Sequence, residues 1–578
     1  MSAAMVVGGL LIGTPVTANA APISGQAFAA YGSGAAVITK ALQLGNTSIA
    51  NAEAAFSGGS VNSQGLNTPV VNEFGVNVQP ATPDKNALGR GTGLEAGLVT
   101  NDPQQSTVNQ VLLSGLAVAT APPPTGPIVK EIPINLNPVA FASTLRGTAA
   151  ATYDPTYCPV GKPLTYGQGY AENLQLLNGG GTVDPTTGFT APVLGTSSTV
   201  NNPRAASQSR TVTYLQPNGD GTFAVVSESR QTVAPISLLA NSTTNTAITV
   251  EVAGEFGLKT VSTGKPGGSS ISYTGNPVLT VSSTVLGVTT NILGPISLQD
   301  IVGANGLTVN VPGLVTVSVG APPRALGGAP GTAPALAANG TSASGAVDAV
   351  RLSLLSLPGL TGLDLALGHM EGAVAAPAGG VTCDIPVSKT ASVDPVTVGQ
   401  DFSYQIHIPA DAAQFNALFN CDLTGISATD TVETQSGSPT IQLISADHGG
   451  VISGNKVTFP SLGNYTLGQD PIVLTINARI PTSSGAGVLR DTVNVTAALG
   501  NCRGGANGED IVNGNAQLNG SAITGAVTLV APNVSRGDLA ATGGNSWPLV
   551  AGGGFLLAAL GLVRLRRRVT DPTAPAES

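Results

Sequence analysis

Apolar and polar residues alternate in short stretches along most of this chain, and Gly, Pro, Asn and Asp separate the stretches. Alternation with a period of two is typical of strands that bury one face, and the separating residues are typical of turns. Strong helix formers such as Lys and Glu are infrequent, which also favours strands. The pattern therefore predicts a mainly β protein.

Alternating stretches occur throughout residues 21–380. We expect these residues to form a large β-rich head of one or two subdomains. The expected strands are residues 35–44, 88–99, 111–119, 246–252, 278–289, 307–320, 347–355 and 363–375. Residues 321–346 form a loop rich in Pro, Ala and Gly. No repeat of fixed period is evident, so the pattern does not support a solenoid.

The clearest local signal is a pair of alternating segments, residues 207–216 and 222–231, around the turn sequence PNGDG at residues 217–221. Asn-Gly and Asp-Gly between such segments are the strongest short-range signal for a β-hairpin. The same residue types also suit a calcium loop, but the ligand spacing and the terminal Glu of an EF-hand are absent. We therefore predict a hairpin turn.

From Cys383 onward the alternating stretches become shorter and more regular. Such strands, with Gly, Pro and Asn in the turns, indicate an antiparallel β-sandwich. The pattern resembles the immunoglobulin-like repeat domains of bacterial surface proteins, and it covers residues 381–532. The resemblance implies a stalk or a spacer.

The C-terminal residues combine three features. They are the pentapeptide Leu539-Ala540-Ala541-Thr542-Gly543, the uncharged apolar segment 547–563, and the basic residues Arg564, Arg566, Arg567 and Arg568. The apolar segment is at the short end of the length that spans a bilayer, and the arginines mark its cytoplasmic side. We therefore predict a C-terminal transmembrane helix over residues 547–563, with the preceding chain outside the cell.

This combination resembles a cell-wall sorting signal of the Leu-Ala-x-Thr-Gly form, which is associated with class E sortases of high-GC Gram-positive bacteria. The resemblance implies that residues 533–578 are the sorting signal and that a sortase cuts between Thr542 and Gly543. The sortase cysteine would attack the Thr542 carbonyl, and an amine of a cell-wall precursor would resolve the acyl-enzyme. The alternative is a membrane anchor that is never cut.

The N-terminal residues predict export. Residues 5–13 are apolar, and the sequence Ala-Asn-Ala that ends at Ala20 matches a signal-peptidase pattern. We therefore expect residues 1–20 to be a signal peptide, cleaved between Ala20 and Ala21. The basic n-region of an ordinary signal is missing, because no Lys or Arg precedes Lys40.

The order of these parts resembles the choice-of-anchor G family of actinobacterial surface proteins. The likeness rests on residues 347–355, the sequence GHME at residues 368–371, the sandwich that begins at Cys383, and the sorting tail. That family has no established biochemical activity. The resemblance therefore implies an architecture and a cell-surface location, and no catalytic residues.

Composition agrees with an exported β protein. Charged residues are 10% of the chain and aromatic residues 4%, and small side chains dominate. Such chains are expected to pack their sheets through small side chains. The single Trp, Trp547, would be lost with the sorting signal, which counts against a carbohydrate-binding module. The net charge of −9 is spread along the chain and argues against nucleic acid as a partner.

The four cysteines are Cys158, Cys383, Cys421 and Cys502. An even number in an exported chain favours disulfides, and no two are close enough in sequence for a zinc site. Three pairings are allowed. We favour Cys421–Cys502 within the sandwich and Cys158–Cys383 across the larger region.

No pattern of residues indicates catalysis or a cofactor. His369, His407 and His448 form no zinc-binding motif, and no nucleophile elbow occurs. His369 and Glu371 share one face of a strand, and we interpret them as a solvent-facing polar pair. Carboxylate pairs for glycoside hydrolysis can be distant in sequence. The acidic residues considered for that role are Asp364, Glu371, Glu251 and Glu255.

The sequence therefore predicts an exported surface protein of structural or adhesive type, membrane-anchored before sorting and then attached covalently to the cell wall through Thr542. Its expected partners are a class E sortase and a cell-wall precursor. No metal and no cofactor are expected, and the sequence indicates no particular adhesion partner. The alternative is a surface-anchored hydrolase that acts on glycans or peptides and uses the sandwich as a spacer.

Overall fold

The computed structural model describes residues 26–44, 47–68, 70–71, 77–79, 81–100, 111–136, 140–155, 158–178, 192–198, 202–241, 246–297, 307–311, 315–321, 334–354, 364–393, 396–502, 517–523 and 527–530. The chain divides into two compact units, Met1–Leu529 and Val530–Ser578. The predicted signal peptide, sorting motif and transmembrane helix lie outside the described residues. Within the described ranges, no helix is long and apolar enough to cross a membrane.

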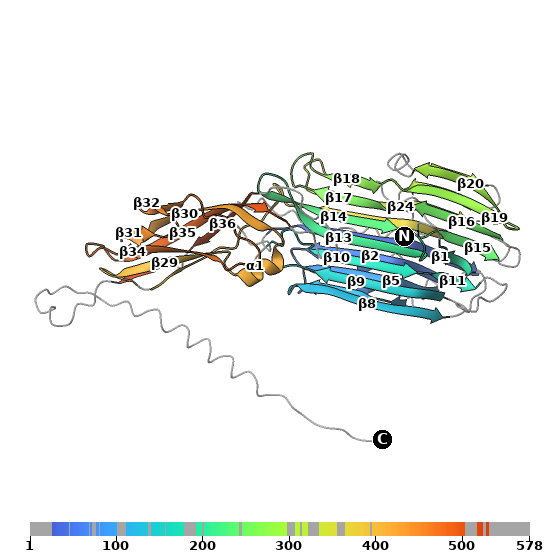
Figure 1. The fold of residues 1–578 in the computed structure, drawn as a ribbon, viewed down its shortest axis with the longest axis horizontal. Coiled ribbons are helices and arrows are strands. Elements are labelled where there is room, and N and C mark those ends of the chain that lie inside the picture. Colours follow the sequence, from blue (N-terminus) through green and yellow to red (C-terminus); the bar gives the residue numbers. More distant parts are fainter. Residues whose placement is uncertain are drawn as a thin grey trace, which may run out of the picture. The chain divides into compact units, whose positions relative to one another are not determined.

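The head contains two large sheets of antiparallel strands (Figure 1). The strands of the ten-stranded sheet are β1 (Ala29–Leu44), β2 (Thr47–Asn62), β5 (Ala87–Thr100), β6 (Val111–Ser114), β7 (Ala117–Ala121), β21 (Leu307–Val311), β22 (Val315–Ala321), β23 (Ala335–Leu336), β24 (Ser342–Leu354) and β25 (Asp364–Ala375). Their order is β21-β22-β24-β25-β1-β2-β5-β6, with β23 paired to β24 and β7 paired to β5. The first strand of the head therefore lies beside its last long strand.

The second sheet of the head has fourteen strands. They are β8 (Thr125–Leu136), β9 (Ala140–Ala151), β10 (Thr165–Glu172), β11 (Gln175–Asn178), β12 (Pro192–Thr196), β13 (Ala206–Pro217), β14 (Thr222–Thr232), β15 (Ile236–Asn241), β16 (Thr246–Ala253), β17 (Phe256–Ser262), β18 (Ser270–Gly275), β19 (Val278–Val285), β20 (Val288–Ser297) and β26 (Val381–Thr382). Their order is β18-β17-β14-β13-β10-β9-β11-β12-β15-β16-β19-β20, with β8 paired to β9 and β26 paired to β14. A separate small sheet pairs β3 (Val70–Val71) with β4 (Asn77–Gln79).

Glycines bring the two large sheets unusually close together. A Cβ added at Gly89 of β5 would lie 2.3 Å from the carbonyl oxygen of Tyr166 on β10. One added at Gly169 of β10 would lie 2.3 Å from the carbonyl oxygen of Phe56 on β2. Facing sheets are ordinarily about 10 Å apart because side chains separate them. The absence of a side chain at these positions allows the backbones themselves to touch.

Hydroxyl groups fill the space between the glycines. The Ser57 hydroxyl on β2 lies 2.7 Å from the Ser209 hydroxyl and 2.8 Å from the Thr211 hydroxyl, both on β13. Thr211 in turn lies 2.9 Å from the Ser229 hydroxyl on β14. A hydroxyl can both donate and accept, so these buried groups satisfy one another. The expectation that small side chains pack the sheets is confirmed.

Several predicted strands are each divided into two. Residues 111–119 form β6 and β7, because Gly115 between them has a φ of +68° and takes the chain out of the extended conformation. Residues 278–289 are divided between β19 and β20, where Leu286 and Gly287 have φ values of 51° and 84°. Residues 307–320 are likewise divided between β21 and β22. A single strand was the wrong prediction in each case.

The predicted hairpin is confirmed, since β13 and β14 pair from Pro217 and Phe223 outward. Gly219 and Gly221 in the turn have φ values of +87° and +85°, which glycine adopts without strain. The Asp220 carboxylate accepts hydrogen bonds from the Thr222 amide at 3.2 Å and from the Thr222 hydroxyl at 2.7 Å, and it pairs with Lys265. The carboxylate thus stabilises the turn itself.

The Asp220 pairing predicts a measurable titration. The Lys265 ammonium, followed by the Thr222 hydroxyl, lowers the pKa of Asp220 to about 2. Because this pKa is depressed in the folded protein, the pair stabilises the fold above the ordinary carboxyl pKa, and the effect is lost as the pH falls toward 2. We expect Lys265→Ala to raise the pKa of Asp220 toward its ordinary value, as measured by carboxyl-carbon NMR. Lys456→Ala, in another sheet, should leave it unchanged; an unaltered Asp220 titration in Lys265→Ala contradicts the assignment.

The predicted sandwich is confirmed as two sheets that follow the head in sequence. Its strands are β27 (Ser388–Ala391), β28 (Val396–Thr397), β29 (Asp401–Ile408), β30 (Asp422–Gly437), β31 (Gln442–Ala446), β32 (Val451–Ser453), β33 (Lys456–Phe459), β34 (Ile472–Arg479), β35 (Gly487–Gly500), β36 (Gln517–Ile523) and β37 (Val527–Val530). One sheet has the order β27-β29-β34-β31, and the other has β28-β37-β35-β30-β33-β32 with β36 paired to β35. Residues 381–382 pair with the head as β26, so the strands of the sandwich begin at β27.

One short helix, α1 (Ala412–Leu418), is the only α-helix within the described residues, and the strand pattern did not predict it. Asp411 is its N-cap, and its carboxylate accepts a hydrogen bond from the Gln414 amide at 3.0 Å. Phe415 and Leu418 are buried against the sandwich core. The Asp before two alanines was the available sequence signal.

Candidate functional site

The predicted processing residues all lie outside the described residues. They are Ala20 and Ala21 at the signal cleavage site, Leu539, Ala540, Ala541, Thr542 and Gly543 in the sorting motif, and Arg564, Arg566, Arg567 and Arg568 in the basic cluster. The four cysteines are described. They form two disulfides, Cys158–Cys383 and Cys421–Cys502, which are the pairings that the sequence analysis favoured.

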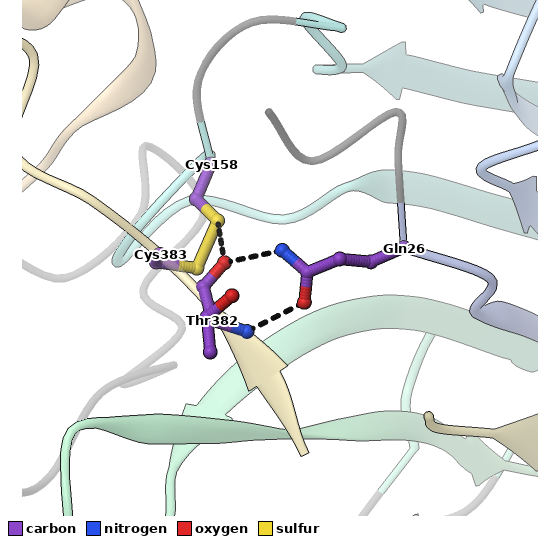
Figure 2. The surroundings of a disulfide bond; sticks show 4 residues. All are labelled: Gln26, Cys158, Thr382 and Cys383. Carbon is purple, nitrogen blue, oxygen red and sulfur yellow. Dashed lines mark hydrogen bonds between the residues drawn. A yellow bond between two sulfur atoms is a disulfide. The ribbon is translucent and has the colours of Figure 1, made fainter. Parts of the chain in front are cut away.

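The disulfide Cys158–Cys383 fastens the segment that leaves the head. Figure 2 shows that the side chain of Gln26, at the start of the described chain, meets the backbone of Thr382 beside this disulfide. The Gln26 amide nitrogen donates to the Thr382 carbonyl at 2.8 Å, and the Thr382 N–H donates to the Gln26 amide oxygen at 2.7 Å. Both cysteines are buried. Covalent and hydrogen bonds thus hold residues 382–383 to two other parts of the head.

The segment that follows Cys158 also contacts the sandwich. Asn420 donates its N–H to the carbonyl of Val160 at 2.9 Å. The Lys162 ammonium donates to the carbonyls of Asn416 at 2.8 Å and Ala417 at 2.6 Å, at the C-terminal end of α1. A cation is favoured there because those carbonyls lack intrahelical partners. Burial lowers the pKa of Lys162.

The second disulfide lies against this contact. Cys421 precedes β30 and Cys502 follows β35, so their bond closes the end of that strand pair. A Cβ added at Gly161 would lie 2.9 Å from the Cys421 sulfur, and Gly161 has a φ of +76°. Gly161 therefore suits both the turn and the close approach. We call residues 158–162, 382–383 and 416–421 the junction.

The junction carries a prediction of moderate size. Gln26→Ala removes both hydrogen bonds to Thr382, each worth about 1 kcal/mol. We expect the Thr382 amide to exchange with solvent up to about 30-fold faster, since the two bonds together contribute about 2 kcal/mol and every 1.4 kcal/mol is a factor of ten. Amide hydrogen exchange measures this rate. Gln64→Ala, at an exposed side chain, should not change it; equal exchange in Gln26→Ala and the parent chain would show that this contact does not protect residue 382.

His369 is buried, which corrects the prediction of a solvent-facing pair. The His369 ring nitrogen Nδ1 lies 2.7 Å from the Asp348 carboxylate, and Arg351 donates to the same carboxylate at 3.3 Å. Asp348 and His369 are direct cross-strand neighbours on β24 and β25. Glu371 lies 3.6 Å from the other ring nitrogen and is partly exposed. Asp348 was not predicted as a partner, because only the strand register brings it to His369.

Two of the four carboxylates considered for glycoside hydrolysis face basic groups. Glu371 faces His369, and Glu255 lies 3.2 Å from the Arg230 guanidinium. Glu251 stands on β16 and Glu371 on β25, which belong to different sheets. The described residues contain no cluster of three His, Cys, Asp or Glu side chains that could hold a metal ion.

Another cluster of ionisable side chains lies inside the sandwich. The Lys389 side chain of β27 pairs with Asp430 of β30 and lies 2.5 Å from the Asp491 carboxylate of β35, and all three side chains are fully buried. The Lys389 ammonium also lies 4.8 Å from the centre of the Tyr404 ring. Lys389 comes from one sheet and both aspartates from the other. We call these three residues the Lys–Asp–Asp cluster.

Burial dominates the electrostatics of this cluster. It raises the pKa of Asp491 to about 7, against the opposing effect of Lys389, and the nearby Asp430 raises it further. Burial also raises the pKa of Asp430, which Lys389 lowers. Two neighbouring buried carboxyl groups disfavour a second negative charge, so the protonated form of Asp491 is favoured well above the usual carboxyl range. The raised pKa makes the neutral carboxyl form of Asp491 accessible near neutral pH, in contact with the Lys389 side chain.

This cluster was not predicted from the sequence, although a signal was present. Asp430 occupies an inward position of the alternation Ile426, Ala428, Asp430, Val432. Asp491 likewise stands between Leu489 and Val493 on the inward face of β35. A lone charge at an inward position requires a partner. Only the fold identifies that partner as Lys389.

Comparisons with known proteins give weak likenesses. No protein-family model and no curated protein matches the chain. The major pilin subunit of Bacillus cereus matches with 11% identity and a TM-score of 0.16, over 32% of this chain and 55% of the pilin. The N-terminal domain of an adhesin of Streptococcus gordonii matches with 10% identity and a TM-score of 0.15, over 70% of this chain and 89% of that domain. The match spans about half of the pilin, and likenesses of this strength carry no argument about function.

Proposed function

We propose that this chain is an exported surface protein of structural or adhesive type, attached to the cell wall by a class E sortase through Thr542. The sorting segment carries this proposal: a Leu-Ala-x-Thr-Gly pentapeptide, an apolar span and an arginine cluster follow one another at residues 539–568. The two disulfides support export, since disulfides persist in oxidising compartments outside the cell.

The junction supports a mechanical role. A chain held at its C-terminus and pulled at its head carries force through the segment that joins head and sandwich. In this chain that segment is residues 382–383, which a disulfide and two hydrogen bonds tie to Cys158 and Gln26. Force at Cys383 is therefore distributed into the head instead of separating β26 from β14. The proposed role of the head is contact with other surfaces or with the envelope itself.

Attachment is tested by mass spectrometry of the protein released from source cells with muralytic enzymes. We expect a mature C-terminus at Thr542 that carries a cell-wall peptide. Thr542→Ala should abolish the wall-linked form, because the pentapeptide would no longer match the motif whose Thr carbonyl the sortase attacks. Thr570→Ala, beyond the arginine cluster, is the matched control and should retain it. Recovery of an intact C-terminus from membranes alone would overturn the attachment.

A further inference from the structure

The Lys–Asp–Asp cluster joins the two sheets of the sandwich at one point of its core. Lys389 stands opposite Ile406 in the β27–β29 register, and Asp491 stands opposite Val432 in the β30–β35 register. Asp430 is opposite Val493, so the two aspartates are diagonal neighbours on one face. Ile406, Val432 and Val493 are buried, and the cluster therefore lies in an apolar, water-poor setting.

An ion pair in such a setting is costly. Taking charges out of water carries a penalty that mutual attraction repays only with full hydrogen bonding. Here Asp430 Oδ2 and both carboxyl oxygens of Asp491 lack a hydrogen bond of ordinary geometry among the described residues, although the Lys389 ammonium contacts both carboxyl groups. A reaction that converts the ammonium and carboxylate into uncharged groups would remove this penalty.

The contacts place a nucleophile against an electrophile. The Lys389 nitrogen lies 2.5 Å from Oδ2 of Asp491, which brings the Asp491 carbonyl carbon within reach. A neutral carboxyl group can be attacked by an amine, whereas a carboxylate resists attack. An amine becomes nucleophilic when a neighbouring base removes its proton, and the Asp430 carboxylate contacts the same nitrogen.

We propose that Lys389 and Asp491 form an intramolecular amide bond between Nζ and Cγ, and that Asp430 is the proton-transfer group. Asp430 accepts a proton from the Lys389 ammonium, and the free amine attacks Cγ of the neutral Asp491 carboxyl. Asp430 then transfers protons between the nitrogen and the departing oxygen, and the bond from Cγ to that oxygen breaks. One water molecule is released.

The step balances without any further reactant. The ammonium, the neutral carboxyl and the carboxylate carry four exchangeable protons and no net charge between them. The product amide, the water and the protonated Asp430 also carry four protons and no net charge, and nothing is oxidised or reduced. The core of the sandwich is left uncharged, and a covalent bond joins its two sheets.

The bond is tested by peptide mapping of the full-length chain after reduction and alkylation. Trypsin cleaves after Lys and Arg, and acylation of Lys389 prevents cleavage there. We expect a branched peptide in which residues 352–456 are joined to residues 491–503, lighter than the sum of the two by one water. Separate peptides ending at Lys389 and beginning at Asp491 would overturn the proposal. A link within residues 352–456 alone would overturn it also, because it assigns the bond to Asp430.

Three variants test the roles of the two aspartates. Asp491→Asn should still give the same branched peptide, because the side-chain amide carbon can be attacked and ammonia leaves in place of water. Asp430→Asn should abolish the branched peptide, while far-UV circular dichroism shows that the sheets are retained. Asp447→Asn, at an exposed aspartate of the same sandwich, is the matched control and should react fully. A branched peptide at the parent level in Asp430→Asn would overturn the assignment of proton transfer to Asp430.

Discussion

Gly91→Ala is expected to lower the free energy of unfolding of the head by about 3 kcal/mol or more, at the upper end of the range for overpacking. The added Cβ would lie 2.1 Å from the Gln168 carbonyl oxygen on β10 and 2.5 Å from the Thr148 carbonyl oxygen on β9. Both obstacles are backbone atoms of central strands, so they can move only if the two sheets separate. Urea-induced loss of far-UV circular dichroism measures the change.

Gly126→Ala on β8 is the matched control, because a Cβ at Gly126 meets nothing within 4 Å. Replacing that glycine should be neutral or slightly stabilising, by less than about 1 kcal/mol, since the unfolded chain loses freedom. Equal stabilities of the Gly91 and Gly126 variants would contradict the close contact of the two sheets.

The double variant Cys158→Ala, Cys383→Ala is expected to lose about 5 kcal/mol of stability, from the loop-entropy model of a disulfide. The estimate is large because the two cysteines are 225 residues apart in sequence, so their bond restricts most of the unfolded head. Thermal unfolding of the variant and the parent under oxidising conditions, in which the parent keeps this disulfide, measures the difference in stability. Under reducing conditions the difference should disappear.

The pair Cys421 and Cys502 gives an internal comparison, because its sequence separation is 81 residues. Its removal should cost about 1 kcal/mol less than removal of the first pair, from the same dependence on loop length. A larger loss for the shorter loop would indicate that native-state packing at the junction, and not the entropy of the unfolded chain, sets the order.

Local patterns predicted the parts of this fold that depend on local physics. Alternation identified part of the strands of the head and sandwich, and the Asn-Gly and Asp-Gly turn identified the β13–β14 hairpin. Such local patterns do not predict which strands pair with one another. β1 pairs with β25, from Ala29 opposite Ala375, and nothing in either segment specifies the other. The divided strands were missed because a single Gly at positive φ, such as Gly115, leaves the alternation on both sides intact.

The buried ionisable clusters also could not be predicted, because their residues meet only through the pairing of strands that are distant in sequence. Lys389, Asp430 and Asp491 each looked like an isolated charge in an alternating strand, and the fold brings them into one core. Asp348 and His369 likewise meet only through the pairing of β24 with β25. The proposed sorting motif differs, because a sortase would recognise it as a linear segment, so its prediction needs no tertiary structure.

The position of β1 beside β25 also constrains how the head is made. β1 cannot pair with β25 until residues 364–375 have been synthesised. The hydrogen bonds between these two strands therefore form only when almost the whole head is available. Folding that depends on such distant contacts is slow, because the loop must close before the contacts stabilise it. In a chain exported from its N-terminus, as proposed above, β1 would lack this neighbour until residues 364–375 had crossed the membrane. The ten-stranded sheet would be completed on the far side of the membrane.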